Sequence, residues 1–164
     1  MLELSNLAVN YGSITALHDV SLNVETGAIV TLIGANGAGE STTLRTVSGL
    51  LKARHGNIRY EGEEISNQPP HRIVGRGISQ VPEGRMIFAN LTVRENLLMG
   101  AYLRKDRHRL GAEFDFVFEI FPPVKFQMAL WPSDHLGTVG FVFRVFGLLE
   151  EGNLLIGMVI RQPF

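Results

Sequence analysis

The sequence predicts an α/β fold in which a glycine-rich loop joins a buried strand to a helix, preceded by an antiparallel β portion. Residues 28–33 (AIVTLI) form a short β-branched apolar run, which is typical of a strand buried on both faces. The glycine-rich segment follows at once, and residues 41–51 then carry leucine and valine at helical spacing. These observations together define the expected fold class.

The N-terminal part of the chain is expected to form strands separated by turns. Residues 2–9 alternate roughly in polarity, and residues 17–24 alternate more clearly, as half-buried strands do. Tyr11–Gly12 ends the first run, and residues 25–27 form a turn before the apolar run. An antiparallel portion is therefore expected around Leu2–Val24.

Short elements are expected after the glycine-rich loop. They are a strand and turn at 56–62, a helical turn at 71–75 and a strand at 78–81. A helix is predicted over 92–103, because Thr92 and Glu95 have the spacing of a capping box. Helical residues resume around 113–120.

The composition excludes several classes of function. Of 164 residues, 45% are hydrophobic and 19% are charged, and the formal net charge is -1. Such a balance provides no basic face for nucleic acid, so no nucleic-acid partner is expected. The chain has no cysteine, which excludes disulfides and thiolate metal sites, and its five histidines lack metal-ligand spacing.

The apolar segments are too short to cross a membrane. The N-terminus shows no basic region followed by an apolar stretch, so no signal peptide is expected. The most apolar part, residues 136–160, is divided by Arg144 and Glu150–Glu151 into runs far below the roughly 18–20 residues that span a bilayer. We expect a cytoplasmic protein in which this part forms buried strand or helix.

The character of the chain changes near Pro122. Residues 123–164 are rich in aromatic residues and show no clear amphipathic period. Residues 1–122 are therefore predicted to belong to one domain, and residues 123–164 to form a divergent tail that is either foreign to that domain or a remnant of its end.

The segment from Gly34 to Thr42 (GANGAGEST) has the pattern of a phosphate-binding loop. Glycines let successive backbone N–H groups turn inward around an anion, and the start of the following helix adds a favourable dipole. The template is G-x-x-x-x-G-K-[ST], and every position fits except the lysine, where this chain has Glu40. Ser41, on the first helical turn, would place its hydroxyl on a nucleotide-bound Mg²⁺.

Two other interpretations of the loop exist. A dinucleotide-binding loop needs G-x-G-x-x-G, but position 36 is asparagine, and Arg54 stands where an acid is wanted. A glycine-rich turn without any ligand stays open. Glu40 bears on that alternative, because its carboxylate would repel the phosphates that a lysine attracts. Two unit charges about 4 Å apart interact by roughly 4 kcal/mol at an effective dielectric near 20. Repulsion in place of attraction would weaken nucleotide binding by several orders of magnitude.

Together with other segments, this loop makes the chain resemble the ATP-binding-cassette ATPases. It is most similar to the smaller ATPase subunit of bacterial branched-chain amino-acid importers, over residues 2–122. The segments that carry the resemblance, besides the loop, are Tyr11–Gly12 with Ala16–Leu17, the hairpin pattern from Gly56 to Ile65, Val81-Pro-Glu-Gly-Arg85, Leu91-Thr-Val93 and Glu95-Asn-Leu-Leu-Met-Gly-Ala101. Glu83, where most cassette ATPases have glutamine, narrows the resemblance to amino-acid transport.

The resemblance implies ATP and Mg²⁺ as ligands. Tyr11 would stack on adenine, Ser41 and Glu83 would serve the metal, and the segment from Arg85 to Met99 would touch a membrane subunit. The phosphates would be wrapped by Gly34, Ala35, Asn36, Gly37, Ala38, Gly39, Glu40, Ser41 and Thr42. The implied partners are the membrane subunits of a transporter and a paired ATPase subunit, at the inner face of the plasma membrane.

The catalytic half of the resembled family is not found in the sequence. After Pro122 there is no L-S-G-G-Q-type signature, and Glu151 is only a weak candidate for the general base. The stretch from Phe146 to Gly157 also resembles a later strand-turn-strand of the family. We therefore expect an incomplete core and an ATPase subunit that is truncated and impaired in catalysis. The alternative is a non-catalytic interaction protein or inert remnant, and an unrelated phosphate-loop kinase or GTPase is disfavoured.

Overall fold

The computed structural model describes residues 1–28, 30–35, 37–81, 88–103, 108, 110–120, 122–126 and 154–157. The chain divides into two compact units. The first is built on Met1–Gln80 with the end of the chain from Ile156, and the second on Val81–Leu155. The predicted boundary near Pro122 falls inside the second unit and stays a prediction.

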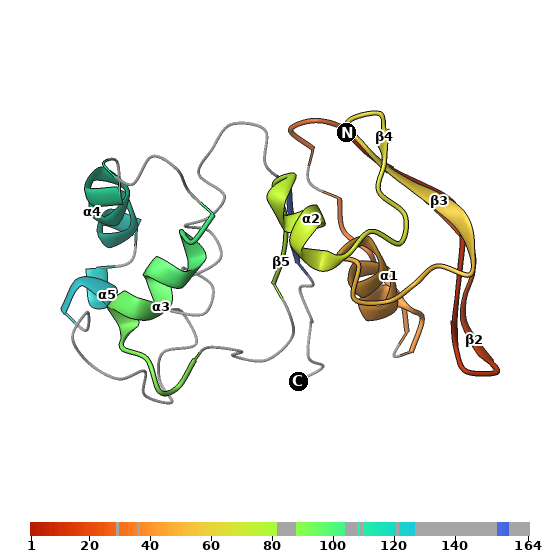
Figure 1. Cartoon of the computed structure of the whole chain (residues 1–164), viewed down its shortest axis with the longest axis horizontal. Helices are drawn as coiled ribbons and strands as arrows, with labels where there is room; N and C mark the ends of the chain where they lie inside the picture. The colour runs from red at the N-terminus through yellow and green to blue at the C-terminus, as the bar shows by residue number, and fades with distance from the viewer. Residues whose placement is uncertain are drawn as a thin grey trace. The chain divides into compact units, whose positions relative to one another are not determined.

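The first unit contains a four-stranded antiparallel sheet in the order β2-β1-β3-β4, which confirms the predicted N-terminal antiparallel portion (Figure 1). Its strands are β1 (Leu2–Tyr11), β2 (Ile14–Val24), β3 (His55–Tyr60) and β4 (Glu63–Glu64). The first two form a hairpin, because Gly12, at φ +60°, reverses the chain between Tyr11 and Ile14.

The side chains of β1 explain why the chain is extended here. Leu2 and Leu4 are buried on one face, and Leu7 and Val9 are buried after a shift in register. The shift lies between Leu4 and Leu7, where Asn6 adopts a φ of +51°. An extra residue at this bulge restores the inward direction of the apolar side chains, so the sheet keeps one buried face.

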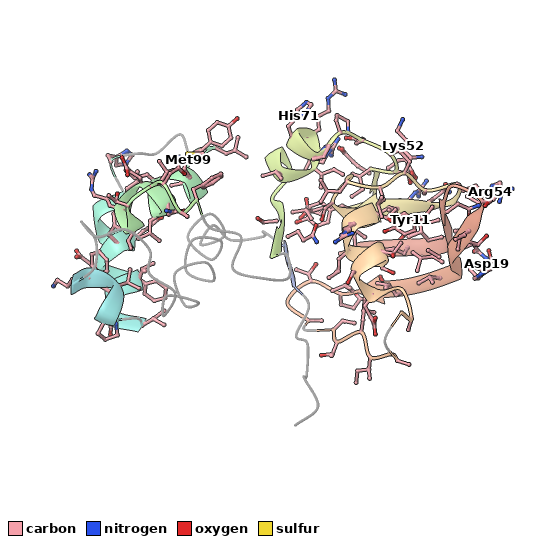
Figure 2. The ribbon with its side chains drawn as sticks, turned by 90° about the horizontal axis from the view of Figure 1, so that it is seen from below. Tyr11, Asp19, Lys52, Arg54, His71 and Met99 are labelled. Carbon is pink, nitrogen blue, oxygen red and sulfur yellow. The ribbon has the colours of Figure 1, made fainter. Side chains whose placement is uncertain are left out.

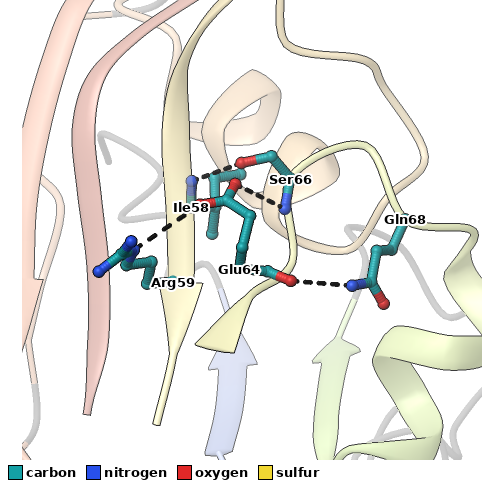
Figure 3. A network of polar contacts seen from close by, with 5 residues as sticks. All are labelled: Ile58, Arg59, Glu64, Ser66 and Gln68. Carbon is teal, nitrogen blue, oxygen red and sulfur yellow. Dashed lines mark hydrogen bonds and ion pairs between the residues drawn. The ribbon is translucent and has the colours of Figure 1, made fainter. Parts of the chain in front are cut away.

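The turn after β3 is held by a network of polar contacts (Figure 3). The backbone N–H of Ile58 donates to Ser66 Oγ at 2.6 Å, and Ile65 N donates back to the Ile58 carbonyl at 2.9 Å. Glu64 lies 3.8 Å from Arg59 as an ion pair, and its carbonyl accepts from the Gln68 side chain at 2.8 Å. These bonds fix the predicted strand and turn at 56–62 in a continuous hairpin.

This unit also contains two helices, and the described residues form a second small sheet. They are α1 (Glu40–Val47), α2 (Pro70–Gly75) and β5 (Ile78–Val81), which pairs with β6 (Leu154–Gly157). The helical spacing predicted over 41–51 is confirmed as far as Val47, since Leu44 and Val47 of α1 are buried, but the helix ends there and Leu50 is exposed. Hydroxyl groups on the same face are satisfied by the preceding turn: Thr46 Oγ1 donates to the Thr42 carbonyl at 2.7 Å.

The prediction of a buried strand at 28–33 is wrong for the residues that the structure describes. Residues 28 and 30–33 form neither helix nor strand, and Ile33 is 92% exposed. An apolar run is stable as a doubly buried strand only between neighbouring strands and covering layers. Neither of the two sheets formed by the described residues includes this segment, so the run lacks that environment.

The second unit contains three helices among its described residues. They are α3 (Val93–Gly100), α4 (Leu110–Ile120) and α5 (Pro122–Phe126). The predicted capping box is confirmed at the start of α3. A small core joins the three helices, with Phe114 and Phe118 stacked beside it at 5.8 Å between ring centroids; its members are Val93, Leu97, Ala101, Val117 and Val124. Among the described residues, no helix combines the length and apolarity that crossing a membrane requires.

Candidate functional site

The glycine-rich loop reaches α1 through two glycines in the left-handed region. Gly37 has a φ of +88° and Gly39 a φ of +101°, a conformation that residues with a side chain rarely adopt. Gly39 is also pressed against β2, because a Cβ added there would overlap the Leu17 side chain and lie 3.3 Å from the Ala16 carbonyl oxygen. Glycine at position 39 is therefore required by both the backbone and the packing.

The start of α1 has no side-chain cap. Its N-cap residue is Gly39, and no side chain caps the helix by a hydrogen bond. The first N–H groups of a helix have no partner within the helix, and the aligned peptide dipoles place partial positive charge at this end. A negatively charged group is consequently stabilised here.

Tyr11 lies beside this helix start. It ends β1 and is 44% exposed, and its hydroxyl group is 3.5 Å from Thr42 Oγ1 on the first turn of α1 (Figure 2). Thus an accessible aromatic ring and the phosphate-type loop, separated by about thirty residues in the sequence, lie together in the first unit. The exposed ring has the area and the flat face that a planar ligand needs for stacking.

The side chain of Glu40 turns back over the loop. A Cβ added at Gly34 would lie 2.6 Å from Glu40 Oε1 and 2.5 Å from the Ala38 Cβ, so both ends of the loop meet closely at Gly34. Between them, the Ala38 N–H donates to the Ala35 carbonyl at 2.8 Å. The carboxylate therefore lies close to the loop backbone at Gly34.

Most of the predicted site residues form one continuous segment. Tyr11 contacts this segment through Thr42. Asn36 and Glu83 lie outside the described residues. The pairing of Ser41 with Glu83 at a metal therefore stays a prediction. The positions in that segment are Gly34, Ala35, Gly37, Ala38, Gly39, Glu40, Ser41 and Thr42. In the part of the chain that the structure describes, no three acidic or histidine side chains converge as a metal site.

The contact of Gly39 with Leu17 was not expected from the residues. Alternation along 17–24 shows that Leu17 is directed inward, and it is 1% exposed, but no local pattern reveals its partner. Through this contact β2 supports the last glycine of the loop.

Comparison with known families gives a match over most of the chain. Residues 17–135 match the family model described as ABC transporter. The chain belongs to this family. Among curated relatives of ABC transporters, the high-affinity branched-chain amino acid transport ATP-binding protein BraG of Pseudomonas aeruginosa is 50% identical over 76% of this chain. The probable branched-chain amino acid transport ATP-binding protein LivG of Archaeoglobus fulgidus is 38% identical over 95% of this chain and 66% of its own length.

This ABC transporter chain spans about half the length of curated relatives such as BraG, of which it covers 53%. Solved structures agree on the fold. An ATP-binding subunit of an ABC transporter superposes with a TM-score of 0.77 at 25% identity, covering 90% of this chain and 61% of that one. An ATP-binding cassette bound to ADP and phosphate superposes with a TM-score of 0.75 at 19% identity, covering 96% of this chain and 73% of that one. The α/β cassette fold is therefore established.

Proposed function

We propose that this chain is the ATP-binding subunit, or part of one, of an importer that energises the uptake of branched-chain amino acids. The observation that carries the proposal is the position of Tyr11 beside Thr42, 3.5 Å apart. It joins an exposed ring, suited to a nucleobase, to a loop suited to phosphates. The relatives BraG and LivG, named for branched-chain amino-acid transport, support this substrate class.

Different residues would bind different parts of the nucleotide. The Tyr11 ring would stack on adenine, and the loop from Gly34 to Gly39 with the start of α1 would hold the phosphates. Ser41 would offer its hydroxyl to Mg²⁺, with Glu83 as the second residue at the metal. The ion supplies positive charge that neutralises the phosphate oxygens when it is bound.

Glu40 argues for weak nucleotide binding and impaired catalysis. Phosphoryl transfer depends mainly on positioning and charge stabilisation, so an acid in the lysine position removes the main favourable term. The signature of the family is also not found after Pro122. We therefore propose that this chain does not hydrolyse ATP by itself.

The proposed partners are membrane subunits of a transporter and a paired ATPase subunit, which places the chain in the cytoplasm at the inner face of the membrane. Met99, on the exposed side of α3, belongs to the proposed contact with the membrane subunit (Figure 2). A non-catalytic interaction protein is the second candidate, and the close approach of Glu40 to Gly34 is the observation that favours it.

Restoring the lysine tests the proposal. Glu40→Lys is expected to raise ATP affinity at least tenfold in a calorimetric titration with Mg²⁺, because repulsion becomes attraction and about 1.4 kcal/mol suffices for a tenfold change. Glu119→Lys, which makes the same charge change at an exposed position of α4, is the control and should leave the affinity unchanged. An unchanged affinity in Glu40→Lys would show that the loop does not bind phosphate.

A further inference from the structure

The phosphate loop carries its own negative group. Glu40 is partly buried although it is charged and stands at the start of a helix, where a side chain is free to extend into water. Instead, its carboxylate approaches Gly34, the first residue of the loop, across the segment that it closes. An acidic residue in the first turn is itself stabilised by the helix dipole, so this orientation has a physical cause.

We propose that Glu40 acts as an internal anion that occupies the phosphate loop, so that a nucleotide must displace this side chain before its phosphates enter. The inference rests on the proposed function, because it concerns the same site. It goes beyond charge repulsion, since the carboxylate then competes for the same backbone amides and the same space as the phosphates.

The closed form of the loop supports this competition. The Ala38 N–H, which belongs to the run of amides expected around an anion, is bonded to the Ala35 carbonyl at 2.8 Å. Ala38 Cβ and Glu40 Oε1 both lie close to Gly34, since a Cβ added at Gly34 would be only 2.5 and 2.6 Å from these two atoms. Binding of a phosphate group would require the carboxylate to leave this position. Such an internal competitor raises the apparent dissociation constant, which equals the intrinsic constant divided by the fraction of molecules in which the loop is open.

Two substitutions separate occupation from charge. Glu40→Gln removes the charge but keeps the length and an oxygen that accepts hydrogen bonds, so part of the obstruction remains. Glu40→Ala removes both the charge and the obstruction. Affinity is measured by calorimetric titration of ATP with Mg²⁺, and of tripolyphosphate, which probes the loop without the base. Glu119→Gln and Glu119→Ala are matched controls on α4, and far-UV circular dichroism verifies that each variant is folded.

The proposal expects Glu40→Ala to bind both probes at least threefold more tightly than Glu40→Gln, with the wild type the weakest of the three. The proposal would be overturned if the affinities of the two variants differed by less than threefold, or if Glu40→Gln bound more tightly. Either result would mean that only the charge of Glu40 weakens binding, and the proposed function would stand. If folded Glu40→Ala and Glu40→Lys both fail to bind ATP, the proposed function fails together with it.

Discussion

Two helices of this protein, α1 in the first unit and α3 in the second, are both eight residues long but begin in opposite ways. At α3, Thr92 Oγ1 accepts from the Glu95 N–H at 3.3 Å, and the Glu95 carboxylate accepts from the Thr92 N–H at 2.7 Å. At α1, Gly39 occupies the cap position in the left-handed region and offers no side chain. The start of α3 is capped by its own side chains, and the start of α1 has no side-chain cap.

The difference shows how a helix start becomes a binding site. Amides that are satisfied by a capping box are not available to a ligand, so the hydrogen bonds at the start of α3 stabilise the helix instead. The start of α1 gives up that stabilisation and keeps its positive end for an anion. In this chain Glu40 supplies an acidic group at that end, which stabilises the helix at the expense of the site.

The largest expected effect is the loss of stability on substitution of Asn96 in α3. Asn96 is fully buried, and its side chain accepts from the Phe88 N–H at 3.0 Å and donates to the carbonyls of Phe88, Leu91 and Thr92. Asn96→Ala should lower the free energy of unfolding by roughly 3 kcal/mol, because it removes four hydrogen bonds made by a fully buried side chain. Urea denaturation measures the loss. Asn90→Ala, at an exposed position nearby, should change little; equal losses would mean that the bonds of Asn96 are not decisive.

The cap position of α1 is tested by a substitution that usually stabilises a helix but should destabilise this protein. Serine is a favourable N-cap in the extended conformation, but Gly39→Ser should destabilise the protein by about 2 kcal/mol, because a φ of +101° strains any side chain. Its Cβ would also overlap Leu17. Gly37→Ser carries similar backbone strain at φ +88° with no atom within 4 Å, so urea denaturation should show a smaller loss. Stabilisation by Gly39→Ser would contradict the left-handed cap.

The same contrast explains which parts of the fold the sequence predicts. The capping box of α3 depends on Thr92 and Glu95, three residues apart, so a local pattern contains all the information. The strands β1 and β2 are likewise predicted by alternation, apart from the earlier start of β2 at Ile14. The run at 28–33 is different, because its burial depends on neighbouring strands that no local pattern specifies. Its apolar residues predict a buried environment that the described residues do not form.

Local sequence patterns likewise predict some residues of the candidate site and not others. Spacing alone identifies the loop from Gly34 to Thr42 and the departure at Glu40, since these residues are contiguous. The role of Tyr11 came only from family resemblance, because its distance from Thr42 is set by the folding of β1 beside α1. The return of the Glu40 side chain to Gly34 depends on two glycines with positive φ, and composition does not reveal such a geometry.

The smallest expected effect is the response of α3 to acid. The side-chain hydrogen bond from Thr92, followed by the bond from its backbone N–H, holds the pKa of the Glu95 carboxyl below its usual value. A lowered pKa in the folded state stabilises the protein above the unfolded value of about 4.3, and this contribution is lost as the pH falls through the folded value. Glu95→Gln retains a side chain suited to the capping box but does not titrate, so its thermal midpoint should fall less than that of the wild type between pH 6 and pH 3. Glu119→Gln, exposed on α4, should follow the wild type. Parallel curves for Glu95→Gln and the wild type would mean that the ionised carboxylate contributes nothing to closing α3, and that its start is held by neutral hydrogen bonds alone.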